Sequence, residues 1–132
     1  MRPLRVLEAA LELTRASVDL RLRPNTSTAA LLGSVQVKNQ PDKPVSALKL
    51  RDAQRVGGTV SRVAGLLPWH PTCLRQALAV QRMLRRRNIP CHLRLGVAHP
   101  SIRAAHAWVT VADHPVVGRS GLECVTPLAS FD

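Results

Sequence analysis

The sequence predicts an α+β fold, in which N-terminal helices are followed by a small antiparallel β-sheet. Apolar residues recur every three or four positions over 3–22, over 47–67 and from Cys73 to Asn88, which is the spacing of a helix face. After Pro90 the spacing changes to two, and apolar residues alternate with polar ones along two successive runs, as in half-buried strands. Helical patterns that precede alternating ones indicate an α+β domain.

The chain length sets the number of domains. With 132 residues, of which 45% are hydrophobic, the chain has enough material for one domain with a real core and not for two. We therefore expect a single domain over 1–132. An N-terminal helix and a polar connector occupy 1–46, and the core of the domain occupies 47–132.

The charge is strongly positive, with 19 Lys and Arg residues against 8 Asp and Glu, or +11 at pH 7. Such a balance on its own indicates a nucleic-acid or anionic-surface partner. The chain has no Tyr, one Phe and two Trp, so it lacks the aromatic residues on which RNA-binding sheets stack bases. We therefore expect no nucleic-acid partner.

The first predicted helix, 3–22, carries an apolar stripe that we expect to pack against the rest of the domain. Pro24 ends this helix. Residues 24–46 are rich in Pro, Asn and Ser, which indicates a loop or poorly ordered connector with room for a short helical piece at 28–32. The stripe consists of Leu4, Leu7, Leu11, Val18 and Leu22.

Two further helices are predicted before the sheet. The first spans 47–67, and its Gly57-Gly58 pair costs about 1 kcal/mol per Gly relative to Ala, so we expect close helix packing there. In the second helix, Thr72 is expected to cap the N-terminus, which places Cys73 in the first turn.

The last helix ends on a dense basic run. Runs of this kind usually form a solvated face that the dipole of the helix C-terminus favours, and specific phosphate binding is the alternative. The run consists of Arg82, Arg85, Arg86 and Arg87.

Two strands are predicted at 91–97 and 105–111 from their alternating pattern. A turn at 113–115 leads into a return strand that begins at Val116, and 125–128 adds a last strand. The less apolar face of the second strand carries His106, Trp108 and Thr110.

The cysteines stand at 73, 91 and 124, with no Cys-x-x-Cys pair, so we expect no structural zinc site. We see no Gly-rich phosphate loop and expect no cofactor. No apolar run approaches the roughly 18–20 residues of a membrane span. Glu8 and Glu12 interrupt the apolar segment that a signal peptide needs, so we expect a cytoplasmic protein with reduced thiols.

Two residues stand out as a candidate catalytic pair. A helix N-terminus favours the thiolate of Cys73, and the Cys73 backbone N–H is suited to stabilising an oxyanion. His106 on the adjacent sheet is suited to taking the thiol proton and returning it to a leaving amine. The alternatives are ordinary: a small buried Cys and a satisfied strand His. Trp69 and Trp108 flank the two segments and are either core anchors or substrate-binding residues.

Four segments together resemble the lasso-peptide leader peptidase family, which are transglutaminase-like, papain-related cysteine proteases. The resemblance covers roughly 47–128 and, more weakly, the N-terminal helix. The Cys-Leu-x-x-Ala and His-Ala-Trp-Val pieces are quite specific at this spacing, whereas either alone is weak. The segments are PWHPTCLRQALA at 68–79, LRRRNIP at 84–90, LGV at 95–97 and AHAWV at 105–109.

The resemblance implies a transglutaminase-like or papain-like core in which the nucleophile falls on Cys73 and the general base on His106. It implies removal of the leader from a ribosomally made precursor peptide, which frees the amine of the core peptide. An asparagine-synthetase-like cyclase would then use that amine, and a separate leader-recognition protein would present the precursor. The Arg82–Arg87 run would attract an acidic leader or that recognition protein.

The third member of a triad is left open. The family usually carries an Asp about a dozen residues past the His, which falls near Gly118. The nearest acid, Asp113, lies in the predicted turn, over about 20 Å along the strand from His106.

Strand pairing points to another acid. If Ala112 pairs with Pro115, His106 falls opposite Gly121, and Glu123 becomes its diagonal neighbour on the same face. Geometry therefore favours Glu123, residue type favours an Asp such as Asp113, and a Cys–His pair with a non-acidic third member is the remaining alternative.

Two other functions compete with leader removal. Transglutaminase-type acyl transfer keeps the nucleophile and replaces water by an amine as the acceptor. A non-catalytic basic domain that binds peptide or nucleic acid keeps the fold without the chemistry.

Overall fold

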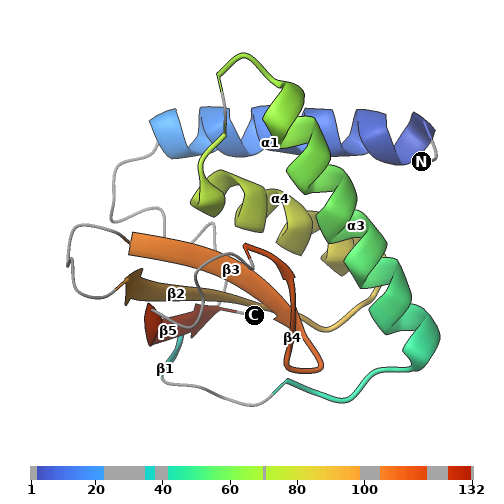
Figure 1. Ribbon diagram of the computed structural model, residues 1–132, viewed down its shortest axis with the longest axis vertical. Coiled ribbons are helices and arrows are strands. Elements are labelled where there is room, and N and C mark those ends of the chain that lie inside the picture. Colours follow the sequence, from blue (N-terminus) through green and yellow to red (C-terminus); the bar gives the residue numbers. More distant parts are fainter. Residues whose placement is uncertain are drawn as a thin grey trace.

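The computed structural model describes residues 3–22, 35–37, 42–69, 71–98, 105–118 and 125–131. The predicted α+β class is confirmed, with helices that pack on an antiparallel sheet (Figure 1). The helices are α1 (Pro3–Leu22), α3 (Ala47–Leu66) and α4 (Cys73–Arg86). The strands are β1 (Val35–Val37), β2 (His92–Ala98), β3 (Ala105–Val111), β4 (His114–Val117) and β5 (Val125–Phe131).

The sheet has the strand order β1-β5-β2-β3-β4, and all of its pairs are antiparallel. The predicted strands at 91–97 and 105–111 are confirmed to within a residue, and the last strand is longer than predicted. β1 lies in the segment that was predicted to be a loop, which corrects that prediction. Three residues are too few to show a period, and β1 exists because β5 offers it an edge.

Helix α4 is the middle layer of the molecule. It lies between α1 and the sheet, and α3 crosses beside it to reach β4 (Figure 1). Because α4 is covered from both sides, its buried residues are not confined to one stripe. They are Ala77, Leu78, Ala79, Val80, Gln81, Met83 and Leu84.

The predicted packing face of α1 is wrong. Leu4, Leu7 and Leu11 are 79%, 67% and 56% exposed, and Val18 is also largely exposed. The buried face lies on the opposite side of the helix and carries one carboxylate among small and apolar residues. It consists of Ala9, Glu12, Leu13 and Ala16.

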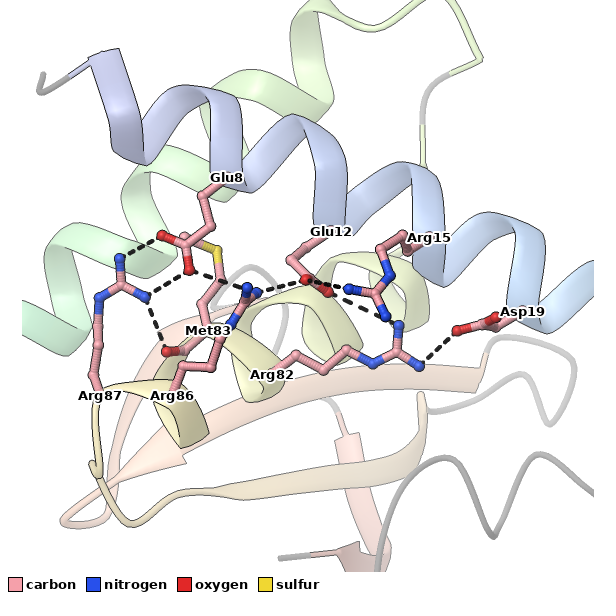
Figure 2. Close-up of polar contacts among 8 residues, drawn as sticks. All are labelled: Glu8, Glu12, Arg15, Asp19, Arg82, Met83, Arg86 and Arg87. Atoms are coloured by element: carbon pink, nitrogen blue, oxygen red, sulfur yellow. Dashed lines mark hydrogen bonds and ion pairs between the residues drawn. The ribbon is translucent and has the colours of Figure 1, made fainter.

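The basic end of α4 explains why α1 turns this way, as Figure 2 shows. Arg87 forms a two-bonded pair with Glu8 at 2.6 and 2.9 Å. Arg86 reaches the buried Glu12 at 2.5 Å, and Arg82 donates to Asp19 at 2.8 Å. These three arginines form a ladder of ion pairs between the two helices. The prediction of a solvated basic face is therefore wrong for them.

The two glycines of α3 have different roles. A Cβ built on Gly57 would lie 1.9 Å from the carbonyl oxygen of Val116, so α3 lies against β4 at this point with no room for a side chain. The expectation of close packing is correct at Gly57, although the partner is a strand. It is wrong at Gly58, where an added Cβ would meet nothing within 4 Å.

The turn between β3 and β4 is tighter than predicted. Its two residues, Ala112 and Asp113, have φ of 49° and 64°, and Val111 pairs with His114 across them. Positive φ at both central residues is typical of the two-residue hairpin turn. The assumed pairing of Ala112 with Pro115 is therefore wrong, and a register shift between Val109 and Thr110 changes the alignment further.

A buried polar cluster at Asp42, in the segment that leads to α3, ties this segment to the sheet. The side chain of Asp42 is 1% exposed and bonds to the His92 ring, to Arg94 at 3.2 Å and to the backbone N–H of Asp113 at 2.7 Å. The His92 side chain is itself only 12% exposed. None of the helices that the structure describes has the length and apolar character that a membrane crossing requires.

Candidate active site

Cys73 is the first residue of α4, as predicted. The side chain of Thr72 accepts a hydrogen bond from the Arg75 backbone N–H at 3.5 Å, which confirms the predicted cap. Thr72 has extended backbone angles, so the chain enters the helix abruptly at Cys73. The Cys73 N–H belongs to the first turn, whose N–H groups a helix cannot pair internally. The half-buried thiol thus stands at the positive end of a helix of 14 residues.

The turn before Cys73 is braced from within the helix. Gln76 lies one turn along α4, and its Nε2 donates to the carbonyl oxygen of Pro71 at 2.9 Å. Pro71 is buried. This bond fixes the backbone just before the thiol. The Thr72 cap and the Gln76 bond therefore both link the turn before Cys73 to the first turn of α4.

His106 lies near the beginning of β3, and its ring has a defined orientation. Nε2 lies 2.7 Å from the carbonyl oxygen of Gly118. A carbonyl only accepts, so Nε2 carries the proton of the neutral ring. Nδ1 is then the unprotonated nitrogen, which is the one that can accept a proton from a thiol.

Trp108 supports the same ring from its face. The two ring centroids are 5.8 Å apart, and the planes are inclined by 19°. Trp108 is only 6% exposed, so its ring is a buried support for the imidazole. The hydrogen bond and the stacking together restrict rotation of the imidazole.

Gly118 was not among the predicted site residues. Its φ is +74°, and an added Cβ would lie 2.6 Å from the carbonyl oxygen of Ala107. Only glycine fits this position without displacement. The one sequence signal was its place twelve residues after His106, where the resembling family usually carries its Asp.

A hollow of about 340 Å³ connects His106 to the helix that carries Cys73. Gln76 of α4 lines it, together with residues of α3 and β4, and the beginnings of α4 and β3 lie on the same side of the molecule (Figure 1). The lining residues carry no formal charge apart from any on the imidazole. They are Gln54, Gly58, Ser61, Gln76, His106, Val116, Val117 and Gly118.

The predicted acids are not brought to this hollow. Asp113 lies beyond the far end of β3, where its Oδ1 accepts from the Asp42 backbone N–H at 3.0 Å. Glu123 lies outside the described residues, and the strand pairing on which its choice rested is not the observed one. Trp69 is 45% exposed and lines a separate hollow with residues of α1.

The described arrangement has the parts that thiol acyl chemistry needs. These parts are a sulfur at a helix N-terminus, an imidazole held in the tautomer that leaves Nδ1 as a base, and backbone N–H groups beside the sulfur. Among the described residues, no group of three or more His, Cys, Asp or Glu side chains could hold a metal ion.

Comparison with known proteins identifies the family. A search among curated proteins and a search among solved structures found no match. The family model of the transglutaminase-like superfamily matches residues 11–130, which includes α3, α4, the second half of α1 and almost the whole sheet. This superfamily includes cysteine proteases and acyl transferases. The chain therefore belongs to the transglutaminase-like superfamily.

Proposed function

We propose that this protein is a cysteine endopeptidase that removes the leader from a ribosomally made, lasso-type precursor peptide. The observation that carries the proposal is the held imidazole of His106, with Nε2 bonded to the Gly118 carbonyl and Nδ1 left as the base. The resemblance of the segments around Cys73 and His106 to lasso-peptide leader peptidases supports the choice of substrate.

The reaction follows from these groups. His106 Nδ1 takes the Cys73 proton, and the thiolate attacks the scissile carbonyl to form a carbon–sulfur bond. The backbone N–H of Cys73 stabilises the oxyanion. The carbon–nitrogen bond then breaks, and the departing amine of the core peptide receives the proton from His106. Water, deprotonated by His106, hydrolyses the thioester and frees the leader carboxylate and the thiol.

The proposal includes partners. The substrate is the precursor peptide, presented by a separate leader-recognition protein. The product amine is the group that an asparagine-synthetase-like cyclase would join to an acidic side chain. The chemistry of Cys73 and His106 requires no metal or nucleotide, so none is assigned to the reaction.

The test is an assay of cleavage of a lasso-type precursor peptide, with the products identified by mass spectrometry. Cys73→Ala should abolish formation of free leader while its unfolding curve stays close to that of the wild type, because a partly exposed thiol contributes little to stability. Cys91→Ala, which changes a buried cysteine away from the site, is the matched control and should retain cleavage.

Two outcomes would overturn the proposal. Full cleavage by Cys73→Ala would show that Cys73 is not the nucleophile. A cross-linked product in place of free leader and core would identify the protein as an acyl transferase. The leader-recognition protein is added to the assays of the wild type and of both variants. A precursor that must be presented by this protein is then still cleaved by an active enzyme.

A further inference from the structure

A third hollow, of about 690 Å³, opens on the outer face of α3 and is lined largely by arginines. Arg51, Arg55 and Arg62 lie at positions i, i+4 and i+11 of the helix, so their side chains form one row. All three are exposed. The remaining lining residues are Arg5, Gln54, Gly58 and Thr59.

The three arginines of this row have no acidic partner among the residues that the structure describes. Arg5 is paired with Asp52 at 3.4 Å, which neutralises one guanidinium at the edge of the hollow. Arg51, Arg55 and Arg62 form no ion pair with a described residue. This distinguishes them from Arg82, Arg86 and Arg87, whose charges are used in holding α1 against α4.

The arginine hollow adjoins the hollow of His106. Gln54 and Gly58 line both, so the two hollows meet along one strip of α3. Gly58 has no side chain, and an added Cβ there would meet nothing within 4 Å, so the passage between the hollows is open at this residue. A chain that leaves the His106 hollow over Gly58 enters the arginine row.

The dimensions suit a peptide. Arg62 follows Arg51 by eleven helical steps, which corresponds to about 16 Å at 1.5 Å per residue. An extended peptide covers that length with about five residues at roughly 3.3 Å each. The row therefore matches a short acidic tract in the chain whose scissile bond lies at Cys73 and His106.

We propose that Arg51, Arg55 and Arg62 form a binding site for an acidic segment of the peptide substrate, continuous with the active site over Gly58. Calling the bound peptide a substrate rests on the proposed function. The binding site itself is tested by binding alone, without catalysis. Continuity with the His106 hollow favours a peptide over a nucleic acid, because a peptide bound to the arginine row extends into the hollow where its bond would be cleaved.

The test measures binding of fluorescein-labelled hexaglutamate to the full chain carrying Cys73→Ala, by fluorescence anisotropy. The wild-type row should bind it with an affinity that falls steeply between about 0.01 M and 1 M salt, where the Debye length shortens from roughly 30 Å to 3 Å. Labelled hexaglutamine should not bind. Arg55→Glu should weaken binding by about tenfold or more, because one attractive contact becomes repulsive.

Lys43→Glu is the matched control, since it makes the same charge change at an exposed residue outside the hollow. Equal losses in Arg55→Glu and Lys43→Glu would show general attraction to a basic protein and overturn the site. A labelled oligonucleotide of six phosphates that binds more tightly than hexaglutamate, with the same dependence on Arg55, would overturn the peptide assignment.

Continuity is tested separately, by the KM for a cleaved acidic peptide. Gly58→Trp fills the passage and should raise KM for that peptide about tenfold. Gly65→Trp makes the same change at an exposed glycine of α3 that lines neither hollow, and it should leave KM near the wild-type value. An unchanged KM in Gly58→Trp would overturn continuity. If no peptide is cleaved by the wild type while hexaglutamate binds at Arg55, the proposed function fails and the binding site stands.

Discussion

The hydrogen bond from His106 to Gly118 gives the candidate site a third member without a side chain. Nε2 donates to the carbonyl at 2.7 Å, where a carboxylate would ordinarily accept. A carbonyl orients the ring and fixes its tautomer, but it gives less stabilisation to the imidazolium that forms during proton transfer than a carboxylate would. Orientation is therefore the function that this residue supplies.

Moving that carbonyl should impair the site. In Gly118→Ala the new Cβ would lie 2.6 Å from the Ala107 oxygen at a φ of +74°, so the backbone must shift. We expect a loss of about 1–2 kcal/mol in the free energy of unfolding, measured in urea, and at least a tenfold loss in the rate of leader cleavage.

Gly58→Ala is the control for this change. It lies within a helix at a site with open space, and should be neutral or stabilising by up to about 1 kcal/mol. Cleavage by Gly118→Ala at the wild-type rate would contradict the assigned role of the carbonyl.

At the scale of elements, pairing between α1 and α4 is decided by charge. Glu12 is almost fully buried and lies within ion-pair distance of both Arg82 and Arg86. Once these residues face each other, the leucines on the far side of α1 must point outward. The apolar stripe therefore predicted the wrong face, because the buried carboxylate of Glu12 needs its guanidinium partners more than the helix needs to cover its leucines.

This pairing makes stability depend on pH. The hydrogen bond from Arg87, assisted by nearby positive charges and opposed by burial, holds the pKa of Glu8 below its ordinary value of 4.5. A carboxylate with a lowered pKa stabilises the folded state above its unfolded pKa and ceases to do so as pH falls through its folded pKa. The wild type should therefore lose stability below a pH of about 4.5.

Glu8→Gln should lack that part of the loss. Urea unfolding measured from about pH 7 down to pH 3 should show a destabilised variant at neutral pH and a shrinking difference toward acid. A difference that stays constant over this range would show that Glu8 acts by packing alone.

The sequence predicted well those elements whose signals are local. Thr72 and Cys73 define a helix start by cap chemistry, and the alternation at 105–111 places His106 on its strand. Gly118 was missed because a main-chain acceptor leaves no trace in residue type. β1 and the face of α1 were missed because each depends on a partner distant in the chain.

At the scale of the whole molecule, Asp42 joins three separate parts of the chain. It bonds to β2 through His92 and Arg94, and to the β3–β4 turn through the backbone of Asp113. Burial opposes ionisation, but the hydrogen bonds from His92, Thr110 and Asp113 and the charge of Arg94 lower the pKa of Asp42 below its ordinary value. The carboxylate is thus a fixed charge in the fold.

Removing this carboxylate should loosen that junction. Asp42→Ala takes the close counter-charge from Arg94, whose side chain is 8% exposed, and should lower the free energy of unfolding by about 3 kcal/mol. Asp113→Ala should cost about 1 kcal/mol, because that side chain is 61% exposed. Equal losses in urea unfolding would contradict the central place of Asp42.

The stacking of Trp108 on His106 also makes the intrinsic tryptophan fluorescence of the protein a probe of the His106 ring. The chain has two tryptophans, and Trp69 is 45% exposed while Trp108 is 6% exposed. In Trp69→Phe the remaining indole would lie with its ring centroid 5.8 Å from the imidazole, close enough for a protonated ring to quench its emission. A fluorescence titration of that variant would follow the charge of the candidate base directly, in the absence of any substrate.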